Sequence, residues 1–218
     1  MAGQAWAALG FSTGTFTSTN SPNLDFKGVF PVAENEAGDK GGINNGGGTI
    51  TIGNVTFVSG VNNSLYFNAT DGAIVGSTFA AEPELNQLMK GLSYRTATSS
   101  GNTFNSGTGI SMIPGFEYKL QLLFHNNDPT LFDPWSVVVE GDTLSGFQVA
   151  TGLATPGQVV TYDFIAADST LNISIFSQGG PQNDTVYLNA FSLEQIPEPS
   201  TVLLLAFGGL LWRRREPR

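Results

Sequence analysis

The sequence predicts an all-β protein, a jelly-roll-type β-sandwich with one short helix. Short segments in which apolar and polar residues alternate recur along the chain, as expected of strands with one buried face. The 218 residues include 27 Gly and 11 Pro, so turn-forming residues are abundant between these segments. The 16 Phe residues supply the apolar surface that an ordered core requires. Together these features indicate one folded domain of ordinary size.

The first half of the chain is expected to supply a hairpin and the single helix. Residues 49–58 (TITIGNVTFV) and 64–69 (SLYFNA) alternate in polarity, and the Gly and Asn residues between them favour a turn. Residues 83–92 carry apolar side chains at helical spacing, which places these side chains on one side of a helix. They are Leu85, Leu88, Met89 and Leu92.

The second half is expected to supply the remaining strands. They are predicted at 117–125, 135–140, 159–166, 171–175 and 186–193. Within the first of these strands, Tyr118, Leu120, Leu122 and Phe124 alternate with mostly polar residues, which indicates one buried face. Seven or more short strands separated by turn residues are typical of a sandwich, and we expect jelly-roll topology.

Charge and composition exclude several classes of function. Residues 1–196 contain 16 acidic and five basic residues, and such an acidic body repels phosphate backbones, so nucleic-acid binding is not expected. The chain has no Cys, which removes disulfides, thiol catalysis and Cys-ligated zinc. The sequence also lacks a phosphate-binding loop, a dinucleotide-binding fingerprint and an HExxH motif.

The last 22 residues form a segment with three parts. Pro197, Glu198 and Pro199 come first, an apolar run occupies 202–212, and Arg213, Arg214 and Arg215 follow. As a helix the apolar run would cover only about 17 Å of the ~30 Å hydrocarbon core. We interpret it as a C-terminal hydrophobic helix that inserts transiently, with the arginines on the cytoplasmic side and the body on the other. An amphipathic or core-packing helix is the alternative.

This tripartite segment resembles the PEP-CTERM sorting signal of bacterial exported proteins. The resemblance implies recognition by exosortase, a membrane transpeptidase, with cleavage near Pro197–Pro199 and loss of the apolar tail. Signals for GPI anchoring follow the same logic, since their apolar tail is also removed. The resemblance places the protein first at the inner membrane and then at the cell surface or in the extracellular matrix. Exopolysaccharide and other glycans are the partners expected there.

The N-terminus shows no complete entry signal. Residues 1–10 (MAGQAWAALG) contain no basic region and no long apolar run, although Ala5-Trp6-Ala7 has the form of a signal-peptide cleavage site. Either the chain begins inside a signal peptide, or these residues are an ordinary flexible terminus. We therefore divide the chain into a flexible N-terminus at 1–20, a sandwich domain at 21–196 and a sorting segment at 197–218.

The body also resembles a known family. The stretch from Pro114 to Glu194 contains PGFEYKLQLLFHN, WSVVVEG, VVTYDFIAADSTLNISI and VYLNAFSLE, and it resembles malectin-like and galactose-binding-like jelly rolls. The resemblance implies a concave face on which aromatic side chains stack against sugar rings. No binding residue is transferred from the family, because no site motif matches.

A glycan site is predicted in the loop between two strands. His125, Asn126 and Asp128 lie at one end of this loop, and Asp133 and Trp135 lie at the other. A flat aromatic ring suits the C–H face of a sugar, while Asn and Asp side chains pair with its hydroxyls. In the alternative interpretation, Trp135 anchors the loop and the polar residues form turns.

No cofactor is expected from the sequence, and structural calcium is the one metal for which it offers candidate ligands. Glu34, Glu36 and Asp39 lie in a Gly/Asn-rich stretch and offer the oxygen ligands that Ca²⁺ prefers. The spacing does not match an EF-hand loop, and solvated loop acids are the alternative.

Catalysis is not expected. His125 is the single histidine, and no GxSxG motif accompanies it. A glycosidase needs two carboxylates at a set separation, and nothing in the sequence brings together any pair of Glu117, Glu140 and Asp163. The sequence therefore predicts an exported envelope or matrix protein, sorted by exosortase, with a non-catalytic, glycan-binding sandwich. A purely structural matrix protein and a secreted glycan-active enzyme are the alternatives.

Overall fold

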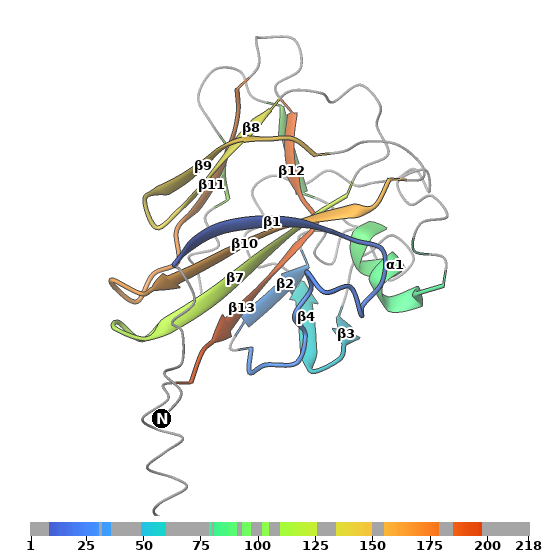
Figure 1. The fold of residues 1–218 in the computed structure, drawn as a ribbon, viewed down its shortest axis with the longest axis horizontal. Coiled ribbons are helices and arrows are strands. Elements are labelled where there is room, and N and C mark those ends of the chain that lie inside the picture. The colour runs from blue at the N-terminus through green and yellow to red at the C-terminus, as the bar shows by residue number, and fades with distance from the viewer. Residues whose placement is uncertain are drawn as a thin grey trace, which may run out of the picture.

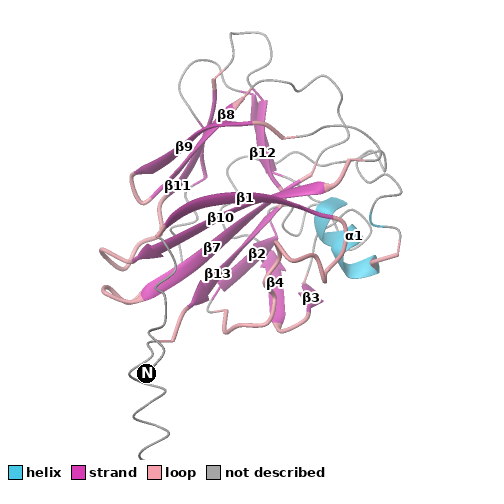
Figure 2. Cartoon of the chain, in the orientation of Figure 1, coloured by secondary structure: helices cyan, strands magenta, loops and turns pink. Residues whose placement is uncertain are grey.

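In the computed structural model two large β-sheets pack face to face, and the described residues also form a two-stranded sheet and one short helix (Figures 1 and 2). The structure describes residues 9–30, 32–35, 49–59, 79, 81–90, 93–96, 102–104, 110–125, 134–149, 155–178 and 185–197. The predicted all-β sandwich with one short helix is confirmed. The predicted C-terminal hydrophobic helix lies outside the described residues.

The larger sheet contains seven strands. In spatial order they are β1 (Gly10–Phe16), β10 (Gly157–Ile165), β7 (Glu117–Phe124), β13 (Ala190–Gln195), β2 (Val32–Asn35), β4 (Val55–Ser59) and β3 (Ile50–Ile52). Neighbouring strands are antiparallel except for β2 and β4, which are parallel.

The second sheet and the helix complete the described fold. In spatial order the second sheet contains β6 (Asn102–Phe104), β11 (Ile173–Ser177), β8 (Trp135–Val139) and β9 (Asp142–Phe147). A two-stranded sheet pairs β12 (Thr185–Leu188) with β5 (Ser93–Thr96), and the helix α1 is Pro83–Lys90.

The main core lies between the two large sheets and follows the alternation predicted from the sequence. Its central side chains are at most 4% exposed, and burial of each contributes about 1.5–3 kcal/mol. From β7 and β10 they are Tyr118, Leu120, Leu122, Phe124, Val160, Tyr162 and Phe164, and from β8 they are Trp135, Val137 and Val139.

A second core, absent from the prediction, covers part of the opposite face of the larger sheet. Leu123, Val159 and Ala190 are buried there against α1 and the β3–β4 hairpin. The helix contributes Leu85, Leu88 and Met89, which confirms three of the four residues predicted for its apolar side, and the fourth, Leu92, lies outside the described residues. The larger sheet is therefore covered on both faces at this end, which explains why β7 carries the apolar Leu123 among its outward-facing positions.

The segment 49–58, predicted as one strand, folds as the β3–β4 hairpin. Gly53 and Asn54 form its turn, and Gly53 has a φ of 59°, a left-handed conformation that glycine adopts without steric cost. Asn54 fixes the turn, because its backbone N–H donates to the carbonyl of Phe26 at 3.0 Å. The predicted partner strand at 64–69 lies outside the described residues.

The segment 186–193, also predicted as one strand, contributes to two sheets. β12 pairs with β5, whereas β13 pairs with β7 and β2. Asn189 lies between them, fully buried. Its Oδ1 accepts from the backbone N–H of His125 at 2.6 Å, and its Nδ2 donates to the carbonyl of Met89 at 3.0 Å. This satisfied amide holds the chain where it changes sheets.

The sandwich begins earlier than predicted. The sequence predicts a flexible terminus at 1–20, but Gly10–Phe16 form β1, which pairs with β10 along its whole length. Phe16 is 1% exposed, and its ring stacks on Phe79 with centroids 5.7 Å apart. The Ser, Thr and Gly residues of β1 give little apolar alternation, because the strand lies at a sheet edge. Residues 1–8 lie outside the described residues.

Candidate functional site

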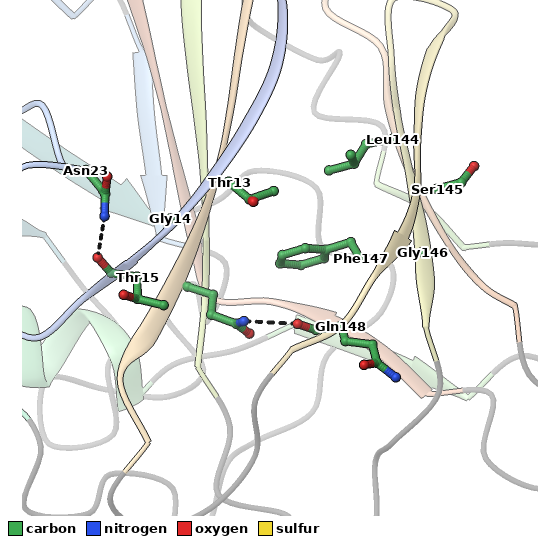
Figure 3. Close-up of a pocket in the computed structure, with 10 residues that line it drawn as sticks. Thr13, Gly14, Thr15, Asn23, Leu144, Ser145, Gly146, Phe147 and Gln148 are labelled. Carbon is green, nitrogen blue, oxygen red and sulfur yellow. Dashed lines mark hydrogen bonds between the residues drawn. The ribbon is translucent and has the colours of Figure 1, made fainter.

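A groove lies between the edge strands of the two sheets (Figure 3). β1 is the last strand of the larger sheet, and β9 is the last strand of the four-stranded sheet. The groove has a volume of about 520 Å³, which is within the usual range for small-molecule sites. Within the described ranges neither β1 nor β9 has a second strand neighbour, so each directs backbone N–H and C=O groups sideways.

The lining of the groove is uncharged. Three hydroxyl groups and three amide side chains account for most of its hydrogen-bonding capacity, with two glycines and two apolar side chains beside them. The lining residues are Thr13, Gly14, Thr15, Asn23, Leu144, Ser145, Gly146, Phe147, Gln148 and Gln158. Hydroxyl and amide groups both donate and accept hydrogen bonds, which matches an uncharged ligand rich in hydroxyls.

Hydrogen bonds hold two of the amide side chains in place (Figure 3). Asn23 Nδ2 donates to the backbone carbonyl of Thr15 at 2.8 Å, on the β1 side of the groove. Gln158 Nε2 donates to the backbone carbonyl of Gln148 at 3.0 Å and so links β10 to the residue that follows β9. The two walls are therefore fixed relative to each other before any ligand binds, which lowers the entropy lost on binding.

The apolar part of the lining rests on the core. Phe147 lines the groove, and its ring lies 5.2 Å from that of Phe124 and 6.4 Å from that of Trp135, measured between centroids. Trp135 itself is 2% exposed and also packs edge-on against Tyr187 at 4.7 Å. A sugar cannot stack on a ring that is buried in this way. The prediction of Trp135 as a stacking platform is therefore wrong, because the four rings fill the core at this point.

His125 is likewise inaccessible to a ligand. It follows the last residue of β7, is 0% exposed, and lies edge-on to Phe79 with centroids 5.0 Å apart. It lies at the second core rather than on a surface loop, because the end of β7 is covered on both faces. The other predicted site residues, Asn126, Asp128 and Asp133, lie outside the described residues.

Of the predicted calcium ligands, Glu34 alone lies within the described ranges. It belongs to β2 rather than to a loop, it is buried, and burial raises the pKa of its carboxyl to about 7. A carboxyl that is partly protonated near neutral pH is a weak cation ligand. Glu36 and Asp39 lie outside the described residues. In the described part of the chain, no group of three His, Asp or Glu side chains could hold a metal ion.

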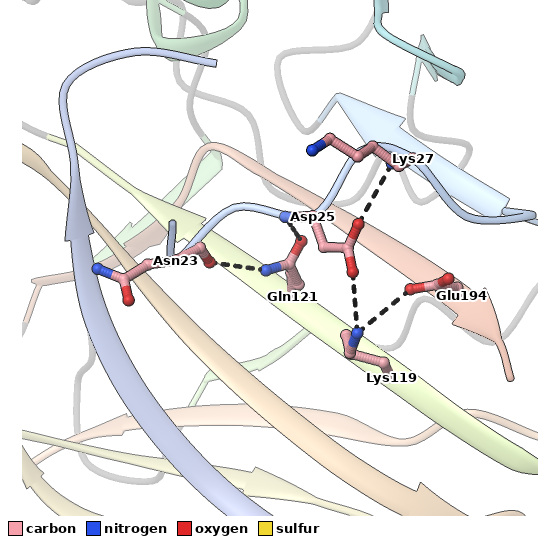
Figure 4. Close-up of polar contacts among 6 residues, drawn as sticks. All are labelled: Asn23, Asp25, Lys27, Lys119, Gln121 and Glu194. Carbon is pink, nitrogen blue, oxygen red and sulfur yellow. Dashed lines mark hydrogen bonds and ion pairs between the residues drawn. The ribbon is translucent and has the colours of Figure 1, made fainter. Parts of the chain in front are cut away.

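A charged cluster lies on the outer face of the larger sheet (Figure 4). Lys119 Nζ is 3.0 Å from Asp25 Oδ2 and 3.5 Å from Glu194 Oε2. Lys119 is also the register partner of Asp163 in β10. Gln121, next along this face of β7, accepts from the backbone N–H of Asp25 at 3.0 Å and donates to the carbonyl of Asn23 at 3.0 Å. The cluster therefore fastens residues 23–25 onto the sheet.

Shifts of pKa within the cluster agree with this structural role. Burial acts to raise the pKa of Asp25, but the hydrogen bond and charge of Lys119 outweigh it and the pKa is lowered. Burial raises the pKa of Glu194 despite the attraction of Lys119. Both carboxylates are therefore paired to one ammonium group, which is the arrangement of an ion-pair network rather than of a nucleophile or general base.

The carboxylates considered for catalysis lie apart from the groove. Glu140 is at the turn between β8 and β9, where its Oε1 accepts from the backbone N–H of Asn172 at 2.6 Å. Asp163 is beside Lys119, and Glu117 begins β7. None of the three lines the groove. The sequence does not predict the groove, because it does not predict β1 and β9 as strands. The one local indication of a strand at β1 is that Thr13 and Thr15 alternate with Gly14.

The C-terminal segment matches a known motif. Residues 195–215 match the model of the PEP-CTERM protein-sorting motif. The chain carries a PEP-CTERM sorting signal. All six predicted signal residues lie within the match, and the signal marks an exported protein that is targeted to exosortase. The PEP-CTERM match begins at Gln195, the last residue of β13, so no spacer separates sandwich and signal. Among the described residues, no helix has the length and apolar character needed to cross a membrane.

Three solved structures align with the body of this chain at low sequence identity. The ectodomain of ANX2 from Arabidopsis thaliana aligns with a TM-score of 0.53 at 11% identity over 78% of this chain and 50% of that chain. A second structure, of the plant receptor-like kinase ANX2, aligns with a TM-score of 0.48 at 12% identity over 78% and 49%. A β-glucuronidase from Bacteroides uniformis aligns with a TM-score of 0.45 at 14% identity over 76% and 18%. No curated protein matches the sequence.

These comparisons bear on the fold of the body alone. The chain spans about half the length of the ANX2 structures that it matches. The first ANX2 ectodomain supports the predicted malectin-like fold of the body, and the low identity restricts the likeness to the fold.

Proposed function

We propose that the exported, exosortase-sorted protein binds neutral glycan chains, without catalysis, in the groove between β1 and β9. The observation that carries the proposal is the lining of the groove. Hydroxyl and amide groups line the groove together with Leu144 and the largely buried Phe147, which is 7% exposed, and no charged side chain is among the ten residues. Sugars present the complementary combination, with hydroxyls around an apolar C–H face.

The acidic body favours a neutral glycan over an anionic one. The formal net charge of the chain is −9, and the positive charge of its C-terminal arginines is lost with the tail on cleavage. Uronic-acid or sulfated polymers would therefore meet a repulsive surface. The groove also lacks the pair of carboxylates that glycoside hydrolysis requires. Binding without hydrolysis agrees with a role in retaining the protein within an exopolysaccharide matrix.

Two substitutions on neighbouring residues of β1 test the groove. Thr13 lines the groove, whereas the exposed Ser12 is not among its lining residues and, one position earlier in the strand, points to the other face. Thr13→Trp should fill the groove and weaken binding at least about tenfold, equivalent to 1.4 kcal/mol. Ser12→Trp adds the same bulk outside the groove and should leave the affinity unchanged. The full chain in detergent would be measured on a glycan array and then by calorimetry with the best neutral oligosaccharide.

The same measurements distinguish the alternatives. Unchanged binding in Thr13→Trp would place the site elsewhere on the protein, and equal loss in Thr13→Trp and Ser12→Trp would show a general effect on the fold instead of a blocked groove. No binding to any glycan, with or without calcium, would favour a purely structural matrix protein. Release of new reducing ends from a bound oligosaccharide would show a glycan-active enzyme and contradict the non-catalytic proposal.

Processing by exosortase is tested by co-expression. With a functional export signal and exosortase present, the exported product should lack the mass of the apolar tail. Replacing Pro197, Glu198 and Pro199 by Ala should leave the tail in place, because the residues that define the cleavage region are gone. Ser200→Ala is the control, since it alters a neighbour of the tripeptide without altering the tripeptide. An intact tail in the exported wild-type protein would contradict exosortase processing.

A further inference from the structure

Four large apolar side chains are exposed around the end of the larger sheet from which the C-terminal segment leaves. They are Leu9, Val29, Ile113 and Ile165, between 49% and 71% exposed, and we call them the apolar rim. Elsewhere in the described part of the chain, Val58 is the remaining exposed large apolar side chain. Single exposed apolar residues are ordinary on protein surfaces, whereas a group of them at one place indicates an interaction site.

Backbone hydrogen bonds place the rim next to the point where the chain leaves the sandwich. The N–H of Gln195, the last residue of β13, donates to the carbonyl of Val29 at 3.2 Å. The N–H of Ile196 donates to the carbonyl of Glu117 at 2.9 Å, and Glu117 is the register partner of Ile165. The exit point is therefore bonded directly to rim residues or to their strand neighbours.

The other two rim residues lie at the same end. Ile113 belongs to the turn before β7, and the N–H of Gly115 in this turn donates to the carbonyl of Ala166, next to Ile165, at 2.8 Å. Leu9 immediately precedes β1, whose first residue pairs with Asp163 near the end of β10. The corresponding ends of β1, β7, β10 and β13 lie together on the left side of Figure 1.

We infer that the apolar rim contacts the export-side surface of the lipid bilayer while the sorting signal is uncleaved. The inference rests on membrane insertion of the apolar run at 202–212, which the proposed function includes. Pro197 and Val202 are five residues apart, so even a fully extended chain separates them by no more than about 18 Å. A sandwich held this close has one end facing the bilayer, and that end is the one that carries the rim.

Apolar side chains of this kind suit the boundary between headgroups and acyl chains. Interfacial segments bury their apolar side chains there to a depth of about 5–10 Å. Because the body is strongly acidic, anionic headgroups would repel it, so the lipid partner is a zwitterionic surface. The rim would hold the sandwich against the membrane and keep the Pro-Glu-Pro segment close to a membrane-embedded transpeptidase. Cleavage of the tail would release the rim, since contact with lipid through four side chains alone is weak.

The chain has no Cys, so single cysteines can carry a fluorescent label without interference. The label would be placed in the full chain at Val29→Cys or Ile165→Cys in the rim, at Val58→Cys as the exposed apolar control, and at Ala206→Cys in the tail. Val58 lies away from the exit point. It pairs with Glu34 of β2, and Glu34 pairs with Phe191, which is four residues before Gln195 in β13. Each protein is added to phosphatidylcholine vesicles with and without a lipid-borne quencher. We expect blue-shifted emission and quenching at the rim and tail positions, and neither change at Val58.

Each other outcome overturns the inference in a distinguishable way. A quenched tail with unquenched rim labels removes the lipid contact but leaves the sorting function intact. Rim labels that respond only after exosortase is reconstituted in the same vesicles assign the rim to the enzyme instead of the lipid. Equal quenching at Val58 shows adsorption without orientation. An unquenched tail shows that the apolar run does not insert, and the inference then fails together with the membrane step of the proposed function.

Discussion

Lys119 and Asp25 are 94 residues apart in the chain, yet Lys119 Nζ lies 3.0 Å from Asp25 Oδ2. This contact crosses from the central strand β7 to the segment that follows β1. It holds that segment against the outer face of the larger sheet, and Glu194 of β13 shares the same ammonium group (Figure 4). The segment includes Asn23, which lines the groove, so the ion pair also supports one wall of the candidate site.

Replacing Lys119 with Met should lower the free energy of unfolding by about 2 kcal/mol. The loss comes mainly from Glu194, whose side chain is 9% exposed. Without Lys119 its carboxylate would stay buried but would have lost its ion-pair partner. Lys27→Met is the control, because the Lys27 ammonium points away from Lys119 and Glu194 (Figure 4) and its charge lowers the pKa of Asp25 less than the charge of Lys119 does. Its effect should stay within about 0.5 kcal/mol. The free energies of unfolding of both variants would be measured by urea unfolding. An equal decrease in Lys119→Met and Lys27→Met would show that the ion pair makes no specific contribution to stability.

The stability of the protein should depend on pH through Glu34. The pKa of its carboxyl is raised by burial from 4.5 to about 7, so between these pH values the folded state binds more protons than the unfolded state. The free energy of unfolding contributed by this group therefore falls as pH rises through that interval. Glu34→Gln removes this pH dependence. The free energy of unfolding of the variant, relative to that of the wild type, should therefore rise by about 2 kcal/mol as the pH goes from about 4 to about 8.

The control for Glu34 is Glu84→Gln, which removes an exposed carboxyl from the first turn of α1. Unfolding by urea at several pH values should give parallel curves for Glu84→Gln and the wild type. A wild-type curve parallel to that of Glu34→Gln would show that the Glu34 carboxyl is not held in a raised-pKa environment.

Trp135→Phe should separate the role of Trp135 in the core from a role in binding. The smaller ring leaves a cavity beside Tyr187 and Phe147, so the midpoint of thermal unfolding should fall, with a loss of about 1–2 kcal/mol. Affinity for a neutral glycan should change less than about twofold, because the indole ring does not reach the surface. Loss of binding at unchanged stability would restore Trp135 as a ligand-binding residue.

Gly157→Ala should be destabilising for a steric reason. A Cβ at Gly157 would overlap the ring of Phe16, which is buried and stacked on Phe79 and so cannot move aside. A loss of about 1–3 kcal/mol is expected. Gly115→Ala is the comparison, since its Cβ would meet open space while its φ of 86° imposes strain of about 1 kcal/mol. Thermal unfolding that ranks Gly115→Ala as the more harmful would contradict the packing at Phe16.

Much of the fold could be predicted wherever burial on one face leaves a regular pattern. In β7 and β10, Tyr118, Leu120, Tyr162 and Phe164 alternate because one face of each strand lies in the main core. The helix could be predicted because Leu85, Leu88 and Met89 all pack against one surface. The sorting signal could be recognised by the resemblance of its three parts to a known signal, since each part is contiguous in the chain.

The candidate site could not be predicted because its determinants are not local. β1 and β9 are edge strands in different sheets, and their Thr, Ser and Gly residues show no strong apolar alternation. His125 and Trp135 appeared to flank a surface loop, but both are buried where cores meet the strand ends. Aromatic and histidine side chains serve equally well as ligand contacts and as core packing, and only their surroundings distinguish the two uses.

The sequence by itself determined the all-β class, the central strands, the helix and the sorting signal, because each depends on residues that are neighbours along the chain. The tertiary structure alone decided which strands lie at the sheet edges, where Asn189 divides β12 from β13, and which polar residues meet in the groove. It also brought Val29, Ile113 and Ile165 to the end from which the signal leaves. The physical reason is that strand pairing joins segments far apart in the chain, such as Gly10 and Asp163. The backbone groups that pair are the same in nearly every residue, so the local sequence carries little record of the partner strand.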